Sequence, residues 1–319
     1  MQIPIVGPTY TNDSRVYDAQ RCVNFYPEVS EATPLGSPSK APSKLVGCAG
    51  LELFATAGNG PVRGGIVTAS GKFYVVSGNT VYEISTLGVA TSLGTIDTSI
   101  GIVRMAENGT HVGIVDGTQG YYITIASDSL AQITDANFPD DATVIDFQDT
   151  YFIVNDPDTG DFYISANNDV TSWSATDKAS VESSPDNLVS LISDHGELVL
   201  AGSRSMEVYY NSGDANFPFD RISQAVLQVG CGAAHTLKSF DNNVMWLSED
   251  DDGGRFIYQL SGAYRAVRVS NVAVETALEG VADISGAYAW VYKQRGHEFY
   301  CLQVPSLNTT WVFDASTRM

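Results

Sequence analysis

The stretch GGIVTASGKFYVVSGNTVYEI, residues 64–84, contains an apolar strand, a tight polar turn, a second apolar strand, a short loop and a strand rich in aromatic and branched residues. The same order recurs six times between Gly64 and Met319, and each unit closes with a final strand. The turns between the first two strands of each unit are expected at 69–72, 107–110, 147–150, 193–196, 240–243 and 284–287.

The spacing of these units is regular in two independent elements. Corresponding turn residues are 38, 40, 47, 47 and 43 residues apart. The third, aromatic strands start 40, 41, 45, 49 and 43 residues apart, and we expect them at 80–84, 120–125, 161–165, 206–210, 255–260 and 298–302. A period of about 40 to 50 residues with about four strands per unit is typical of propeller blades.

The sequence therefore predicts an all-β fold, a six-bladed β-propeller of four-stranded blades over residues 64–319, preceded by an extended N-terminal arm over residues 1–63. Radial stacking suits such units, because a single four-stranded sheet cannot cover both of its faces. Residues 271–280 are the best candidate for a helical turn. The blades are placed at 64–97, 98–140, 141–183, 184–230, 231–280 and 281–319.

The closure of the ring stays open at this point. Each predicted blade begins with its own first strand and ends with its own fourth, which for the last blade is expected at 310–314. Either the arm supplies a strand to the ring, or the first and last blades simply pack. Because the chain stops at Met319 directly after a strand, we expect the natural protein to continue beyond it.

The arm has two short apolar pieces, 22–26 and 51–54, on either side of a Pro/Ser-rich spacer at 30–44. The spacer cannot continue a helix or a central strand, so we expect it to be extended and exposed. The apolar pieces can anchor the arm on its own propeller or on a neighbouring subunit, and we favour the neighbour slightly. The candidate contacts with a subunit or an adaptor are Val23, Phe25, Tyr26, Leu51 and Phe54.

The charge is strongly acidic, with 37 Asp and Glu against 17 Lys and Arg and a formal net charge of −20. This balance disfavours binding to nucleic-acid phosphates, which requires clustered Lys and Arg. Acidic side chains can keep the surface solvated, or they can line a passage along which DNA slides without sticking. Because no apolar run of about 18 residues and no secretion signal is found, we expect that the protein does not insert into a membrane and that it assembles in the cytoplasm.

No catalytic constellation is found, and we predict that the protein is not an enzyme. A sialidase-like propeller needs an arginine triad. Arg63 and Arg104 are expected at the starts of inner strands, whereas Arg221, Arg265 and Arg268 fall on fourth strands at the outer rim. Nucleophile elbows, phosphate-binding loops and dinucleotide fingerprints are also missing from the sequence.

We predict no metal and no cofactor. The segment SEDDDGGRF, residues 248–256, is similar to an Asp-box turn whose glycine comes one residue late. Its carboxylates could also bind calcium, but an exposed hairpin tip is the favoured interpretation. The remaining candidate ligands are scattered without metal-type spacing: His111, His195, His235, His297, Cys22, Cys48, Cys231 and Cys301.

The order of several short motifs resembles the packaged-DNA stabilisation proteins of phages, the tail hub or nozzle proteins of short-tailed bacteriophages. The resemblance begins with RCVNFYPE at 21–28, the Pro-rich spacer, AGLELF at 49–54 and GPVRG at 60–64. It continues through NGT at 108–110 and IVDG at 114–117, and it is densest from 138 to 213, including SWS at 172–174 and EVYY at 207–210.

This resemblance implies a structural virion protein of the phage tail, with typically six copies in a ring below the portal and its head–tail adaptor. Such a homo-hexamer helps to retain packaged DNA and holds a needle, spike or fibre, while DNA passes nearby without sequence-specific binding. Family members often continue beyond the propeller, so functions of such a part are not carried over. The alternative is a carbohydrate- or receptor-binding propeller, either a tail-fibre module or a sialidase relative.

Overall fold

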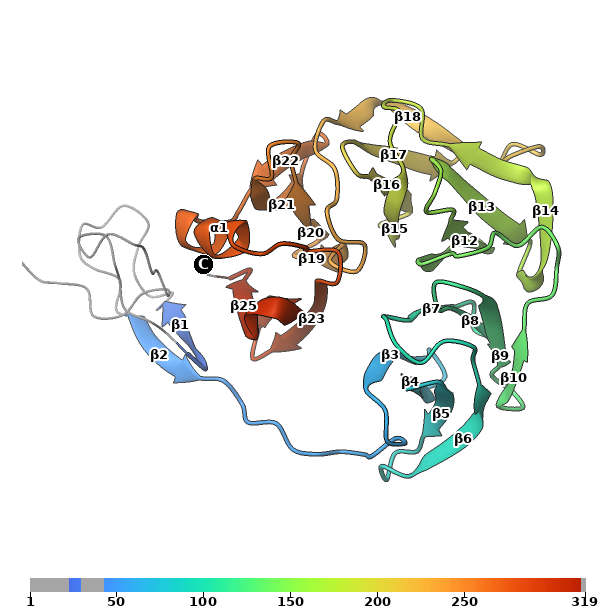
Figure 1. Cartoon of the computed structure of the whole chain (residues 1–319), viewed down its shortest axis with the longest axis horizontal. Coiled ribbons are helices and arrows are strands. Elements are labelled where there is room, and N and C mark those ends of the chain that lie inside the picture. Colours follow the sequence, from blue (N-terminus) through green and yellow to red (C-terminus); the bar gives the residue numbers. More distant parts are fainter. Residues whose placement is uncertain (1–22, 30–42, 317–319) are drawn as a thin grey trace, which may run out of the picture.

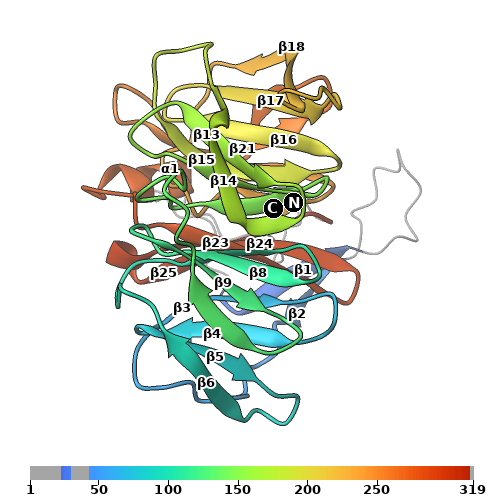
Figure 2. The ribbon, with the colours of Figure 1, turned by 90° about the vertical axis from the view of Figure 1, so that its right-hand side faces the viewer.

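The computed structural model describes residues 23–29 and 43–316, and nearly all of its regular structure is β. Figure 1 shows six antiparallel sheets arranged in chain order around a common centre, with each sheet forming one blade. The predicted fold class, a six-bladed β-propeller with an N-terminal arm, is confirmed. Figure 2 shows the same blades from the side, with the β1–β2 hairpin of the arm beside β24 of the last blade.

The strands of each blade pair in chain order from one edge of the sheet to the other. Blades 1 and 2 comprise β3 (Val62–Val67), β4 (Phe73–Ser77), β5 (Thr80–Ile84) and β6 (Ala90–Thr95), then β7 (Arg104–Glu107), β8 (His111–Val115), β9 (Gly120–Thr124) and β10 (Ser129–Gln132). Blades 3 and 4 comprise β11 (Ile145–Gln148), β12 (Tyr151–Asn155), β13 (Asp161–Ala166) and β14 (Asp169–Ser180), then β15 (Leu188–Asp194), β16 (Glu197–Gly202), β17 (Met206–Asn211) and β18 (Phe219–Leu227).

The last two blades are separated by the α-helix. Blade 5 comprises β19 (Lys238–Phe240), β20 (Asn243–Glu249), β21 (Arg255–Ser261) and β22 (Arg265–Arg268), and α1 (Val272–Glu279) follows it. Blade 6 comprises β23 (Tyr288–Gln294), β24 (His297–Val304), the 3-10 turn η1 (Pro305–Leu307) and β25 (Thr309–Asp314). The arm contributes β1 (Phe25–Val29) and β2 (Ser43–Gly47), which pair only with each other among the described residues.

The first five predicted hairpin turns lie between the first two strands of their blades, as expected. In the fourth, His195 and Gly196 have φ angles of 52° and 82°, the left-handed pair that a two-residue hairpin turn requires. The first five aromatic third strands are likewise confirmed as β5, β9, β13, β17 and β21. For five blades, the turn residues and the composition of the strands were therefore sufficient to predict where the first hairpin and the third strand lie.

The sixth turn was predicted wrongly. The hairpin of blade 6 turns at Arg295 and Gly296, with φ of 52° and 83°, and not at 284–287. The first strand of this hairpin, β23, contacts the inner strand β19, and Ala289 N–H donates to the His235 carbonyl oxygen at 3.1 Å. Thus β23 is the inner strand of blade 6, the segment expected to be its third strand lies in the second strand β24, and β25 is the third. The described part of blade 6 has three strands.

The helix explains this shift. The predicted helical turn at 271–280 is confirmed as α1, and the side chain of Asn271 caps it by accepting a hydrogen bond from Val274 N–H. Its residues Val274 and Leu278 pack into the core shared by blades 5 and 6. The helix lengthens the fifth unit, so the true turn at Arg295–Gly296 lies further along the chain than the turn-like residues at 284–287.

The hydrophobic core consists of separate clusters, each between two neighbouring blades. Five clusters join blades 1 and 2, 2 and 3, 3 and 4, 4 and 5, and 5 and 6. A sixth cluster joins blade 6 to the arm through Tyr26, Phe299 and Cys301. Among the residues described, no core cluster joins blade 6 to blade 1. The arm hairpin therefore covers a face of blade 6 without adding a strand to any blade.

Candidate functional site

The arm hairpin packs on its own propeller chiefly through the aromatic side chain of Tyr26, with Val46 and Cys48 beside it. Tyr26 is 5% exposed, and its ring lies 5.3 Å from the ring of Phe299 and 4.7 Å from that of His297. His297 is itself held by Asp314, whose carboxylate oxygen lies 2.7 Å from the ring Nδ1. Of the residues predicted to contact a subunit or an adaptor, Tyr26 thus contacts blade 6 of the same chain.

The other predicted contact residues are exposed. Val23 is 54% exposed and Phe25 is 53% exposed, at the start of the same hairpin, and Leu51 and Phe54 are exposed in the connection to blade 1. This connection passes close to blade 1, because a Cβ added to Gly88 would lie 2.3 Å from the Phe54 carbonyl oxygen. The spacer predicted to be extended at 30–44 lies outside the described residues, apart from the first residues of β2. Cys22 also lies outside them.

Blade 6 has a half-covered face, which sequence reasoning missed. The strand register aligns Trp290 of β23 with Cys301 of β24, and Cys301 with Val312 of β25. The arm covers Cys301, whereas Trp290 is 40% exposed and Val312 is 47% exposed. Tyr288 extends the exposed part, with its ring 6.0 Å from the Trp290 ring. Aromatic residues alternate along 288–292, and this pattern could have predicted one apolar face of a strand. The face was not recognised because the turn of this blade was placed too early, at 284–287.

Arg63, a candidate for gripping a substrate carboxylate, is used by the fold. Its side chain is 6% exposed and lies between blades 1 and 2. Its five N–H groups donate to the carbonyl oxygens of Gly78, Thr98, Ile100 and Gly101 and to the Thr98 hydroxyl, at 2.6 to 2.9 Å. A guanidinium has five donors. Arg63 therefore has no donor left for a ligand and acts as a clamp between two blades.

The other arginines do not converge with Arg63 into a triad. Arg221 lies in β18 and pairs with Glu207, while Arg268 lies in β22 and pairs with Glu275 of α1. Arg265 is exposed at the start of β22. These positions agree with the outer-rim placement predicted from the sequence. Such ion pairs tie the last strands to neighbouring segments of the same chain.

The acidic segment at 248–256 forms the turn between β20 and β21. The Asp250 carboxylate accepts hydrogen bonds from the backbone N–H groups of Asp252 at 3.1 Å and Gly254 at 2.5 Å. Asp251 pairs with the exposed Arg204 at 3.0 Å. Over 23–29 and 43–316, no group of three or more His, Cys, Asp or Glu side chains is arranged to hold a metal ion. Asp250 thus shapes the hairpin turn.

The four histidines lie in separate environments. His195 connects the turns of blades 4 and 5, with Nδ1 2.8 Å from Asp194 and Nε2 2.8 Å from Asn242. The hydrogen bond with Asp194 raises the pKa of this imidazole. His111 begins β8, His235 precedes β19 and His297 packs under the arm.

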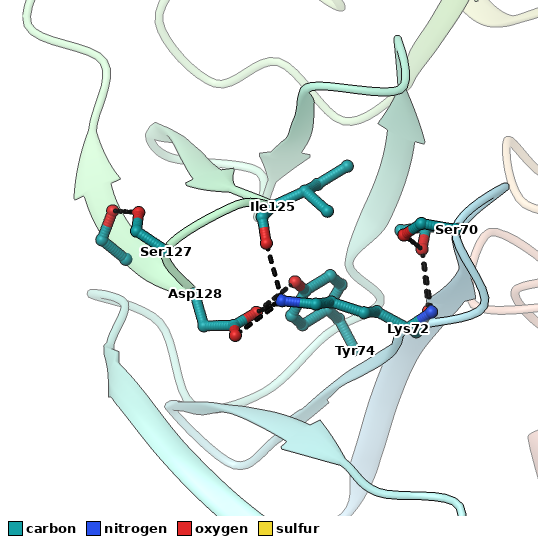
Figure 3. Close-up of polar contacts among 8 residues, drawn as sticks. Ser70, Lys72, Tyr74, Ile125, Ser127 and Asp128 are labelled. Atoms are coloured by element: carbon teal, nitrogen blue, oxygen red, sulfur yellow. Dashed lines mark hydrogen bonds and ion pairs between the residues drawn. The ribbon is translucent and has the colours of Figure 1, made fainter.

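A polar bridge links blades 1 and 2 at the rim of their shared core (Figure 3). The Lys72 ammonium donates to both Asp128 oxygens at 2.6 and 2.7 Å and to the Ile125 carbonyl oxygen at 2.7 Å. The Tyr74 hydroxyl donates to Asp128 at 2.5 Å. Burial raises the pKa of Asp128, but the hydrogen bonds from Lys72 and Tyr74 outweigh it and leave the pKa below its ordinary value. The sequence had given Lys72 only a place in a turn.

The comparison with protein families decides what this scaffold belongs to. A family model described as "Bacteriophage P22 Gp10, beta-propeller", of the phage stabilisation type, matches residues 1–319. The chain belongs to this family. It is a bacteriophage structural protein involved in packaged-DNA stabilisation and is associated with the virion. The resemblance stated from the sequence motifs is thereby confirmed.

The other comparisons are less specific. No curated protein matches the chain. Similar solved structures include the extracellular domain of BT4673 from B. thetaiotaomicron, at 12% identity and a TM-score of 0.49, covering 78% of this chain and 33% of that one. The computationally designed Ika8 protein is also similar, at 12% identity and a TM-score of 0.49, covering 85% of this chain and 77% of that one. The chain thus spans about a third of the length of the first of these.

In the described ranges, α1 and the short η1 turn are the helical elements, and no helix there is long and apolar enough to cross a bilayer.

Proposed function

We propose that this protein is a tail hub or nozzle subunit, which forms a homo-hexameric ring below the portal and its head–tail adaptor. In that position it helps to retain the packaged DNA and anchors the needle, spike or fibre of the tail. The observation that carries the proposal is the family match over residues 1–319. A role as a non-enzymatic scaffold agrees with the use of Arg63 and Asp250 in the fold.

The surfaces available for assembly support a ring. The arm hairpin exposes Phe25 on the face opposite Tyr26, and Val23 is exposed just before the hairpin. The uncovered part of blade 6 exposes Trp290 and Val312 beside Cys301, which the arm covers. Contiguous exposed apolar side chains mark interaction sites more often than isolated ones do. We propose that a second copy of this chain covers this combined surface. The acidic charge of −20 suits a position near DNA, because it repels the phosphates instead of holding them.

The role in the virion is tested with a phage that carries an early stop codon in this gene. We expect particles that fill their heads with DNA and then lose it, and complementation in trans should restore retention. Mass spectrometry of wild-type virions should find the chain in a fixed ratio to the portal protein. Virions without this chain, or stop-codon particles that keep their DNA, would contradict the proposed role.

The ring is tested on the purified full chain mixed with its portal–adaptor complex. The variant Phe25→Ser should abolish incorporation into the complex, because it places a hydroxyl in the proposed apolar contact. Leu87→Ser is the matched control, since Leu87 is also an exposed apolar residue but lies in the β5–β6 turn of blade 1. Equal incorporation of both variants, seen by negative-stain microscopy, would refute the arm as an assembly contact.

A further inference from the structure

The inner strands bring a set of charged side chains to the centre of the propeller. Arg104 begins β7, Asp146 lies in β11 and Lys238 begins β19, while His235 lies three residues before Lys238. They come from blades 2, 3 and 5, whose inner strands surround the centre in Figure 1. Each side chain is partly accessible to solvent. We refer to these four residues as the axial cluster.

The members of the axial cluster are close enough to act on one another electrostatically. Burial and the charge of Arg104 lower the pKa of His235 to about 3, so its imidazole is neutral. Burial lowers the pKa of Lys238, and Arg104 lowers it further, while Asp146 acts in the opposite direction. Burial likewise raises the pKa of the Asp146 carboxyl, against the effect of Arg104. The cluster thus contains two side chains that carry positive charge in water and one carboxylate.

The hydrogen bonds of the cluster are unevenly distributed. Asp146 is satisfied by the protein, because its oxygens accept from Phe147 N–H at 2.8 Å and from Ser193 N–H of β15 at 2.9 Å. In contrast, Arg104 Nε and His235 Nδ1 are buried and have no hydrogen-bond partner within the described part of the chain. A buried polar group without a partner is destabilising, and more so if it is charged. The groups that lack partners therefore belong to Arg104 and His235, whose side chains both carry N–H donors.

The unpartnered groups of Arg104 and His235 indicate which kind of ligand could bind to them. A guanidinium forms its strongest contacts with the oxygens of carboxylates and phosphates, often in pairs. The only carboxylate of the cluster already faces the backbone of two blades. A small anion with several oxygens would accept from Arg104 and His235, and its negative charge would favour the protonated form of Lys238, whose pKa is lowered by burial and by Arg104.

We propose that Arg104, His235 and Lys238 form a binding site for a small oxyanion, of the size of inorganic phosphate or sulfate, at the centre of the propeller. A free anion is favoured over a phosphate of a DNA strand, because Arg104 Nε is enclosed by the protein. The site would link blades 2 and 5 through one bound ion. It lies apart from the arm and the blade 6 surface, so it can fail while the proposed ring assembly stands.

The experiment is a thermal melt of the purified full chain titrated with sodium phosphate, at an ionic strength held constant with sodium chloride. We expect a saturable rise in Tm with phosphate, because a ligand bound only by the folded state stabilises it by mass action. The same titration with a single-stranded oligonucleotide should give no rise. A Tm that does not depend on phosphate, or an oligonucleotide that acts at lower concentration, would overturn the proposal.

Substitutions locate the effect. Arg104→Met should remove the phosphate-dependent rise, whereas Arg265→Met, which removes the same charge from an exposed position on β22, should keep it. We expect Arg104→Met to fold, because it removes a buried charge that lacks a partner. His235→Gln provides a second variant, and it should weaken phosphate binding about tenfold in calorimetry while leaving the phosphate-free Tm nearly unchanged. An equal loss in Arg265→Met, or no loss in either cluster variant, would contradict the site.

Discussion

Blade 1 and blade 6, at the two ends of the ring, cover the faces of their sheets in different ways. Blade 1 buries one face fully against blade 2, with Tyr74 and Ile114 in the shared core and Arg63 and Lys72 as polar clamps beside it. Blade 6 buries one face against blade 5, but its other face is covered only in part by a two-stranded hairpin. The junction of two blades is therefore stabilised by both apolar area and hydrogen bonds, whereas the hairpin depends mainly on Tyr26.

The largest expected effect is at the blade 1–blade 2 junction. Arg63→Met should lower the free energy of unfolding by about 3 kcal/mol or more, because four carbonyl oxygens and the Thr98 hydroxyl would lose the buried charged donor that joins them. Urea unfolding followed by circular dichroism measures this change. Arg265→Met is the control and should stay within about 0.5 kcal/mol of the wild type. A loss at Arg63 no larger than that of the control would show that the clamp is not needed.

A smaller effect is expected for the bridge at the rim of the same junction. Lys72→Met should cost about 1 kcal/mol at neutral pH, since the Lys72–Asp128 pair is partly exposed and is weakened by solvent.

The pH dependence of this loss distinguishes the ion pair from simple packing. The folded-state pKa of Asp128 lies below its ordinary value of 3.8, so the contribution is complete above that value and is lost as the pH falls through the lower folded pKa. The difference between wild type and Lys72→Met should therefore shrink below about pH 4. In a double-mutant cycle, the effects of Lys72→Met and Asp128→Asn on the free energy of unfolding should be non-additive. A difference independent of pH would refute the assignment.

At the hairpin, the expected effect is local. Tyr26→Ala should leave the unfolding of the propeller within about 1 kcal/mol of the wild type, because the hairpin is peripheral. It should instead expose Cys301, which is 2% exposed and whose thiol pKa burial raises to about 12. Labelling by iodoacetamide, read by peptide mass spectrometry, should become several-fold faster at Cys301. Cys231, buried between blades 4 and 5, is the internal control. Unchanged labelling of Cys301 would mean that Tyr26 does not cover it.

The smallest effect on stability is expected on the uncovered part of blade 6. Val312→Thr should change the free energy of unfolding by less than about 0.5 kcal/mol, because the side chain is already solvated. Incorporation into the portal–adaptor complex should nevertheless fall if a second copy covers this face. A clear loss of stability with normal incorporation would show that Val312 serves the fold alone.

Sequence reasoning succeeded where the information was local. A turn such as His195–Gly196 and a strand such as Thr80–Ile84 are recognisable from a few adjacent residues, and repetition multiplied this signal. It failed at 284–287, because the turn-forming residues Ser285 and Gly286 follow the inserted helix at a spacing close to that of the other units. The true turn at Arg295–Gly296 has the same left-handed geometry as His195–Gly196, and its glycine was the available clue.

The candidate site was less predictable. The residues of the arm were recognised as apolar and as candidates for contact, but the sequence could not tell Tyr26, which packs on Phe299, from the exposed Phe25 one position earlier. The two alternate because successive side chains of a strand point to opposite faces, and only the docking of the hairpin decides which face is inward. The sequence likewise could not distinguish Arg63 from Arg104, which were both expected near the centre. All five N–H groups of Arg63 are hydrogen-bonded, whereas Arg104 Nε has no partner within the described residues.

The sequence by itself determined the all-β repeat, the number of blades, the acidic surface and the family, because each depends on composition or on short segments in a fixed order. Only the tertiary structure decided that the arm covers blade 6, that Lys72 meets Asp128 and that Arg104 lies near enough to Lys238 to lower its pKa. These pairs are far apart in the chain, and nothing local specifies them. They arise from the angle at which one blade stacks on the next, which is set by the packing of whole sheets.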